Sequence, residues 1–95
     1  KCGGLDGAAD MAKRAQELGL KVMLGSMSES SLGCAAMASL AGTADLLDLD
    51  GPWLISNDPF QGLGMEDGKL VVEGSAGIGV HLRAGAELEF IPIGA

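Results

Sequence analysis

Apolar side chains recur through the first eighteen residues with the spacing of a single helix face. They stand at Leu5, Ala8, Ala12, Ala15 and Leu18. Side chains three or four residues apart lie on the same side of an α-helix, so this pattern predicts an amphipathic helix over residues 5–18. Gly19 follows directly and is expected to end the helix, because glycine adopts the left-handed backbone conformation without a steric penalty.

Residues 20–52 alternate between short apolar runs and a second helical pattern. Residues 20–24 (LKVML) form a run typical of a buried parallel strand. Several serines precede residues 29–41, which are rich in small residues and predict a helix that begins at a serine cap. Residues 46–50 (LLDLD) predict another strand, which ends at Gly51-Pro52. The order helix, strand, helix, strand is typical of right-handed βαβ units, so we predict an α/β fold with a parallel sheet.

The remaining residues carry turn sequences and β-type patterns. Asn57-Asp58-Pro59 and Glu66-Asp67-Gly68 are typical turns, and the second lies between short apolar stretches, which predicts a β-hairpin. The predicted strands here are residues 69–73, 79–82 and 90–93. Pro92 restricts the last of them to a sheet edge, because proline has no amide proton to donate to a neighbouring strand.

Charge and cysteine content narrow the classes of partner. Thirteen acidic residues against six basic ones give a net charge of −7, which opposes binding to nucleic acid or anionic lipid and leaves ammonium-bearing ligands as candidates. No apolar run approaches the roughly 20 residues of a membrane-spanning helix. Cys2 and Cys34 lack CxxC spacing, so we expect reduced, partly buried thiols of a cytoplasmic protein. The opening KCGG reads as the junction of two elements, so we expect a segment of a longer protein.

Two carboxylates, Asp48 and Asp50, stand two residues apart in a predicted strand. Alternate residues of a strand point to the same face, so the two negative charges would lie side by side and would attract a cation. Asp50 with Gly51-Pro52 also fits a simple turn, but Asp48 lies inside the strand and does not. The pattern lacks the further oxygen ligands of an EF-hand Ca²⁺ loop, while binding of Mg²⁺ by two carboxylates stays open.

Polar side chains follow three successive predicted strand ends. In parallel α/β sheets, ligands bind beyond the carboxyl ends of the strands. Lys1 would follow a strand that precedes the chain, Ser26 to Ser28 follow the next one, and the aspartate pair follows the third. Each has a simpler explanation: Lys1 as a solvated lysine, and the serines as helix caps. Their common location favours a binding site.

Three motifs together resemble the C-terminal part of the barrel domain in the enolase superfamily. They are KCGGL at the start, MLGSMSESSLG in the middle and DLDGP after it. Within the superfamily they are most similar to the dipeptide epimerases of the L-Ala-D/L-Glu type, from Lys1 to about Gly79. The resemblance implies a (β/α)₇β barrel, with residues 1–56 covering the end of strand six to strand eight. Residues 57–95 would then form a post-barrel helix or loop and short β segments that return to a capping domain.

The resemblance also implies an isomerase that inverts an α-carbon through an enediolate stabilised by Mg²⁺. Lys1 would be one of two lysines that remove and return the α-proton of the substrate. Asp48 and Asp50 would bind the α-ammonium group of a dipeptide through charge-assisted hydrogen bonds. Ser26 to Ser28 would line the pocket, with Met27 as a contact that influences specificity.

The same resemblance places the Mg²⁺ ligands and the second lysine upstream of Lys1, so no metal ligand is expected in this segment. The segment alone should be inactive, with the remainder of the barrel and the capping domain as partners and a homo-oligomer left open. One alternative is another enzyme of the superfamily, a cycloisomerase or an o-succinylbenzoate synthase, whose substrate has no ammonium group. A second alternative is a non-catalytic fragment that needs a partner chain.

Overall fold

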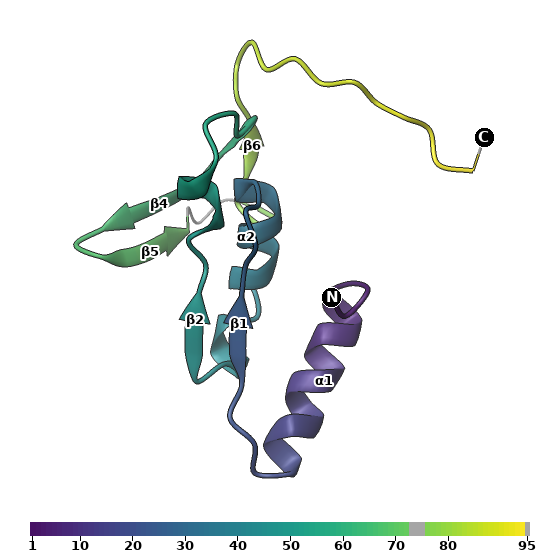
Figure 1. Cartoon of the computed structure of the whole chain (residues 1–95), viewed down its shortest axis with the longest axis vertical. Helices are drawn as coiled ribbons and strands as arrows, with labels where there is room; N and C mark the ends of the chain where they lie inside the picture. Colours follow the sequence, from purple (N-terminus) through teal and green to yellow (C-terminus); the bar gives the residue numbers. More distant parts are fainter. Residues whose placement is uncertain (73–75, 95) are drawn as a thin grey trace.

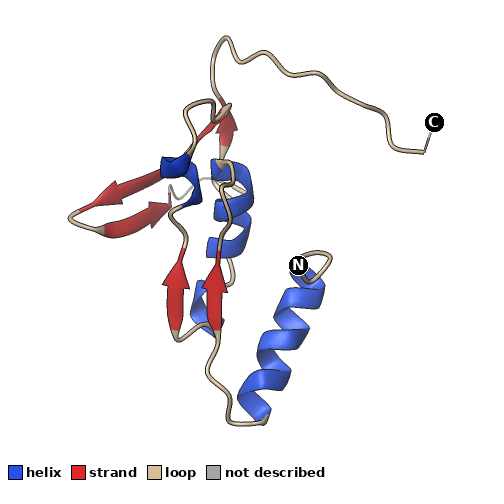
Figure 2. Cartoon of the chain, in the orientation of Figure 1, coloured by secondary structure: helices blue, strands red, loops and turns tan. Residues whose placement is uncertain are grey.

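The computed structural model describes residues 1–72 and 76–94 of the chain. It begins with two helix–strand units, shown in Figures 1 and 2. Their elements are α1 (Leu5–Glu17), β1 (Met23–Gly25), α2 (Ser31–Ala38) and β2 (Leu46–Asp48). β1 and β2 are parallel neighbours, with Met23 opposite Leu46 and Gly25 opposite Asp48. The predicted α/β order is confirmed, although each strand is shorter than its apolar run because its ladder has only one partner strand in the described structure.

Helix α1 ends at the glycine that the sequence indicates. Gly19 has a φ of 73°, and the amide of Leu20 donates to the Ala15 carbonyl oxygen at 2.9 Å. The amide of Gly19 donates to the Gln16 carbonyl oxygen at 3.0 Å, which completes a Schellman motif. The small residues of the predicted helix face lie nearest β1, and Ala12 is buried.

The core lies between α2 and the residues that follow β2. Cys34 and Ala35 of α2 are buried together with Leu49, which comes directly after β2. The small side chains of α2 allow this close packing against the short 3₁₀ helix η2 (Gly51–Leu54). The expectation of two partly buried thiols is wrong for Cys2, which is exposed because it precedes α1 in an open segment. No helix in the described ranges is long and apolar enough to cross a membrane.

A β-hairpin projects from the core, as predicted. β4 (Leu63–Glu66) and β5 (Lys69–Val72) are antiparallel and are joined by Asp67 and Gly68, with φ of 50° and 73°. Positive φ at both turn residues is the type I′ geometry that suits the twist of a two-residue hairpin. The predicted end of this strand at residue 73 lies outside the described residues.

Two further short strands pair across the chain, and a long tail follows them. β3 (Phe60–Gln61) and β6 (His81–Leu82) are antiparallel, with Phe60 opposite Leu82. The predicted strand over residues 90–93 is wrong: these residues form no strand, and Phe90, Ile91 and Ile93 are at least 79% exposed. An edge strand needs a neighbour to bond with, and Figure 1 shows the tail extending away from every other element.

Candidate functional site

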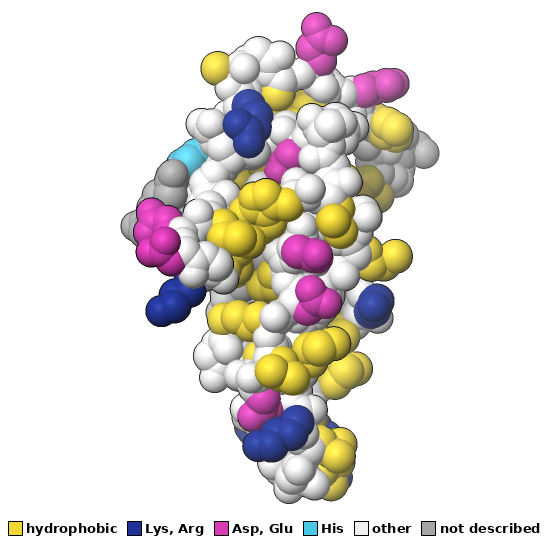
Figure 3. Space-filling model, turned by 60° about the vertical axis from the view of Figure 1, so that its left-hand side comes forward, with side chains coloured by type: hydrophobic (Ala, Val, Ile, Leu, Met, Phe, Trp, Pro, Cys, Tyr) yellow, Lys and Arg dark blue, Asp and Glu magenta, His cyan; other side chains and the backbone are white. Residues whose placement is uncertain are grey.

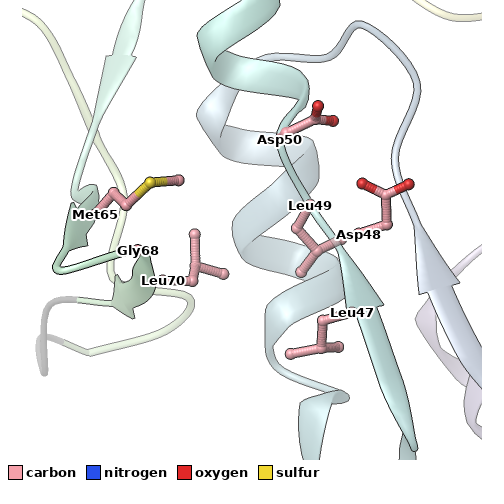
Figure 4. A pocket seen from close by; sticks show the side chains of 7 residues that line it. All are labelled: Leu47, Asp48, Leu49, Asp50, Met65, Gly68 and Leu70. Carbon is pink, nitrogen blue, oxygen red and sulfur yellow. The ribbon is translucent and has the colours of Figure 1, made fainter.

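The aspartate pair lies at the carboxyl end of β2, as the sequence predicts. Asp48 is the last residue of β2, and Asp50 directly precedes η2. Figure 4 shows the two carboxylates leaving the chain toward the same side, while Leu47 and Leu49 point to the other. Leu49 is only 6% exposed, so a shift of one residue in the strand would expose this leucine and bury a carboxylate. The buried leucine therefore fixes both carboxylates at the surface.

Neither carboxylate of the pair is neutralised by a basic side chain within the described ranges. The ion pairs there join Arg14 to Glu17 and Lys21 to Asp45, both away from the strand end. Two adjacent carboxylates without a cationic partner favour a ligand that carries positive charge, and an ammonium group can donate a hydrogen bond to each. Figure 3 shows acidic and hydrophobic side chains lying side by side over the middle of one face of the molecule.

The β4–β5 hairpin lies on the side of the segment to which Leu47 and Leu49 point, opposite the two carboxylates (Figure 4). One pocket is lined on one side by residues 47–50 and on the other by Met65, Gly68 and Leu70, as Figure 4 shows. Met65 and Leu70 are opposite each other in the hairpin, so their side chains share one of its faces. The sequence predicts the hairpin but not its position next to β2, because no local pattern shows against which element a hairpin packs.

The loop after β1 lies directly against the segment that carries the pair. The amide of Ser26 donates to the Asp48 carbonyl oxygen at 2.8 Å, and the Ser26 hydroxyl accepts a hydrogen bond from the Gly51 amide at 3.1 Å. Met27 and Ser28 are exposed, and the Met27 amide donates to the Glu29 carboxylate at 3.1 Å. The structure thus brings Ser26 to Ser28 beside the pair and gives the Ser26 hydroxyl a role in joining two loops.

A serine occupies the N-cap position of α2, as the sequence predicts, but an aspartate makes the capping hydrogen bonds. Ser30 occupies the N-cap position, but its side chain makes no capping hydrogen bond. Instead the Asp58 carboxylate accepts hydrogen bonds from the Ser31 hydroxyl and from the Ser31 amide, the latter at 2.9 Å. Its other oxygen accepts from the Phe60 amide at 3.1 Å. Sequence reasoning took Asp58 for a turn residue, because nothing local reveals a contact 27 positions away along the chain.

The environment of Asp58 stabilises its charged form. Partial burial acts to raise the pKa of Asp58, but the hydrogen bonds from Ser31 and Phe60, with the nearby positive charge of Arg83, lower that pKa below its ordinary value. The guanidinium Nε of Arg83 also donates to the Asp58 carbonyl oxygen at 3.1 Å. These bonds attach the segment after η2 to the start of α2, and hence to the loop that carries Met27.

Cys34 lies beneath the two loops and is fully buried. Burial raises the pKa of its thiol, and the negative charges of Glu29 and Asp50 raise it further, although a hydrogen bond with the Ser26 side chain acts in the opposite direction. A buried neutral thiol is a poor nucleophile. Cys34 therefore packs the floor of the site and is unsuited to attack a substrate.

Lys1 is exposed, and the described structure gives its side chain no ion pair or hydrogen bond with the aspartate pair. Figure 1 shows the N-terminus near the level of the carboxyl ends of β1 and β2 along the long axis of the molecule. No group of three His, Cys, Asp or Glu side chains that could hold a metal ion occurs among residues 1–72 and 76–94.

Comparison with known proteins finds relatives that are named epimerases or racemases. No family model matches the chain. An L-Ala-D/L-amino acid epimerase of Maribacter sp. is 46% identical over 84 residues, covering 87% of this chain and 25% of that protein. An N-acetyl-D-glutamate racemase of Pseudoalteromonas sp. is 41% identical over 70 residues, covering 74% of this chain and 22% of that protein.

Among solved structures, the chain matches a substrate-liganded complex of the L-Ala-D/L-Glu epimerase from Bacillus subtilis. The TM-score is 0.76 and the identity 31%, over 90% of this chain and 24% of that one. The chain thus spans about a quarter of the length of the relatives that it matches.

Proposed function

Because the chain belongs to the dipeptide epimerase family of the enolase superfamily, we propose that it contributes half of the substrate site of a dipeptide epimerase of the L-Ala-D/L-Glu type. Three lines of support are the 46% identity to an L-Ala-D/L-amino acid epimerase, the match to the Bacillus subtilis structure and the aspartate pair. In this proposal β1 and β2 are neighbouring strands of a (β/α)₇β barrel, and residues outside the chain complete it.

The observation that carries the proposal is the pair of carboxylates on one side of a strand end (Figure 4), to which no residue in the described ranges gives an ion pair. Asp48 and Asp50 would each accept a charge-assisted hydrogen bond from the α-ammonium group of the dipeptide. A ligand without that group would leave two negative charges facing each other with no counter-charge. The pair would therefore select substrates with a free amino terminus.

The remaining residues of the site would orient the rest of the dipeptide. Met27 is 63% exposed on the loop next to the pair and would contact a substrate side chain. Met65 and Leu70 lie across the pocket from Leu47 and Leu49, on the side opposite the carboxylates (Figure 4), and would not contact the ammonium group. Because apolar contacts of this kind discriminate weakly between similar side chains, we expect the pair to dominate recognition.

We propose Lys1 as an acid–base residue, on the basis of the KCGGL motif. Its Nζ would take the α-proton from one face of the substrate or return it, and a second lysine outside this chain would act at the opposite face. Enzymes of the superfamily generally use Mg²⁺, and the residues present here do not fit that ion. Its ligands would lie outside the chain, so we assign no step through it. The cytoplasmic location and the homo-oligomer stay predictions from the sequence.

The test is isotope exchange by the complete protein. With Mg²⁺ in D₂O, we expect L-Ala-L-Glu to exchange the glutamate α-proton for deuterium and to form the L,D-diastereomer, as followed by proton NMR. Exchange without inversion would still indicate proton abstraction. Absence of both exchange and inversion across a panel of dipeptides would contradict the proposal.

A second candidate is a racemase of N-acylated amino acids, which the similarity to an N-acetyl-D-glutamate racemase favours. Such a substrate has an uncharged amide nitrogen and gives the aspartate pair no cation to bind. Turnover of N-acetyl-glutamate together with inert dipeptides would favour this second candidate.

A further inference from the structure

Gly51 occupies the point where the loop after β1 comes closest to the segment that carries the aspartate pair. It is buried, and it directly follows Asp50. A Cβ atom at this position would collide with the Met27 carbonyl oxygen and would lie 3.0 Å from the Glu29 amide nitrogen. Gly51 is not among the residues with positive φ, so the lack of space, and not its backbone conformation, is what requires glycine here.

Hydrogen bonds on both sides of Asp50 connect the same two segments. The Ser26 hydroxyl accepts from the Gly51 amide at 3.1 Å, and the Ser26 amide donates to the Asp48 carbonyl oxygen at 2.8 Å. Asp50 therefore lies between two residues that are each bonded to Ser26. Below them, the fully buried Cys34 interacts with Ser26 and with the Gly51 backbone, so the segment has no room to move inward.

We infer that Gly51 is a positioning residue for recognition of the ammonium group: its close approach to the Met27 loop holds Asp50 beside Asp48. This inference rests on the proposed function. Gly51 itself would touch no substrate and would act through Asp50. A side chain at position 51 would push the two segments apart and move the Asp50 carboxylate out of reach of a nitrogen that Asp48 still binds.

The experiment compares Gly51→Ala with Gly42→Ala in the complete protein. Gly42 is a matched control, because a Cβ atom there meets no atom within 4 Å and its φ is not positive. The ligands are L-Ala-L-Glu and its des-amino analogue, N-propionyl-L-glutamate, which has the same shape without the ammonium group. The measured quantities are KM and kcat for the dipeptide, the inhibition constant of the analogue and the melting temperature.

For Gly51→Ala we expect KM for the dipeptide to rise about tenfold or more, which corresponds to one weakened hydrogen bond between charged groups. The kcat should change much less, because the lost contact stabilises ground state and transition state equally. The inhibition constant of the analogue should stay unchanged, so the preference for the dipeptide falls by the same factor. Gly42→Ala should match the wild type in every quantity.

An equal rise for dipeptide and analogue would overturn the inference, since it would indicate general disruption of the site. If Gly51→Ala does not fold, Ser26→Ala decides the question, because it removes the hydroxyl acceptor without adding atoms. It should reduce the preference for the dipeptide, and an unchanged preference would overturn the inference. If the wild-type protein shows no preference for the dipeptide over the analogue, the proposed function is wrong. The role of Gly51, which rests on that function, is then wrong as well.

Discussion

Replacing Asp58 with alanine should destabilise the protein by detaching the segment after η2 from the start of α2. The Asp58 carboxylate accepts three hydrogen bonds, from the amide and hydroxyl of Ser31 and from the amide of Phe60. At about 1.5–3 kcal/mol for each bond to a charged group, their sum would be about 4.5–9 kcal/mol. That sum is too high, because Asp58 is only partly buried and water can replace part of what is lost.

Helix-cap replacements give a better measure, about 0.5–2 kcal/mol. Because the Phe60 bond adds to the cap, we expect about 2 kcal/mol for Asp58→Ala, and about half of that for Asp58→Asn, which keeps one acceptor oxygen. The assay is urea denaturation of the complete protein, with the free energy of unfolding obtained by extrapolation. Asp10→Ala is the control, because Asp10 is exposed on α1. A loss for Asp58→Ala within about 0.5 kcal/mol of the control would refute the reasoning.

Two further predictions concern charge. Because the pKa of Asp58 is lower in the folded than in the unfolded protein, its stabilisation is complete above the ordinary carboxyl pKa of about 4 and is lost as the pH falls through the folded value. The difference in unfolding free energy between wild type and Asp58→Asn should therefore be constant from pH 7 to about pH 5 and shrink below about pH 4. A difference that increases as the pH falls would contradict this prediction. Lys1→Ala should abolish turnover of at least one stereoisomer in a polarimetric assay, whereas Lys13→Ala, on α1, should keep wild-type kcat.

The features that the sequence predicted correctly are set by neighbouring residues. Gly19 ends α1 because glycine tolerates positive φ, and Asp67-Gly68 forms the hairpin turn for the same reason. The order of helices and strands follows from local periodicity in the same way. The alternation of Asp48 and Asp50 with buried Leu49 is also a property of a single strand.

The features that the sequence missed depend on contacts between distant residues. Asp58 caps α2 from 27 positions away, and the Ser26 hydroxyl bonds to an amide 25 positions away. Neither pairing has a local pattern, since serine and aspartate each suit turns and caps in many settings. The strand predicted over residues 90–93 failed for the complementary reason: its residue types suit a strand, but the described structure provides no neighbour for it.

The most direct test of the central claim measures how the aspartate pair responds to the charge of the ligand. In the complete protein, Asp48→Asn and Asp50→Asn should each raise KM for L-Ala-L-Glu by about tenfold or more, with the inhibition constant of N-propionyl-L-glutamate unchanged or lower. The amide keeps the size of the side chain and removes its charge, so the difference reports the ammonium contact. Equal effects on both ligands, or no effect on either, would contradict the account.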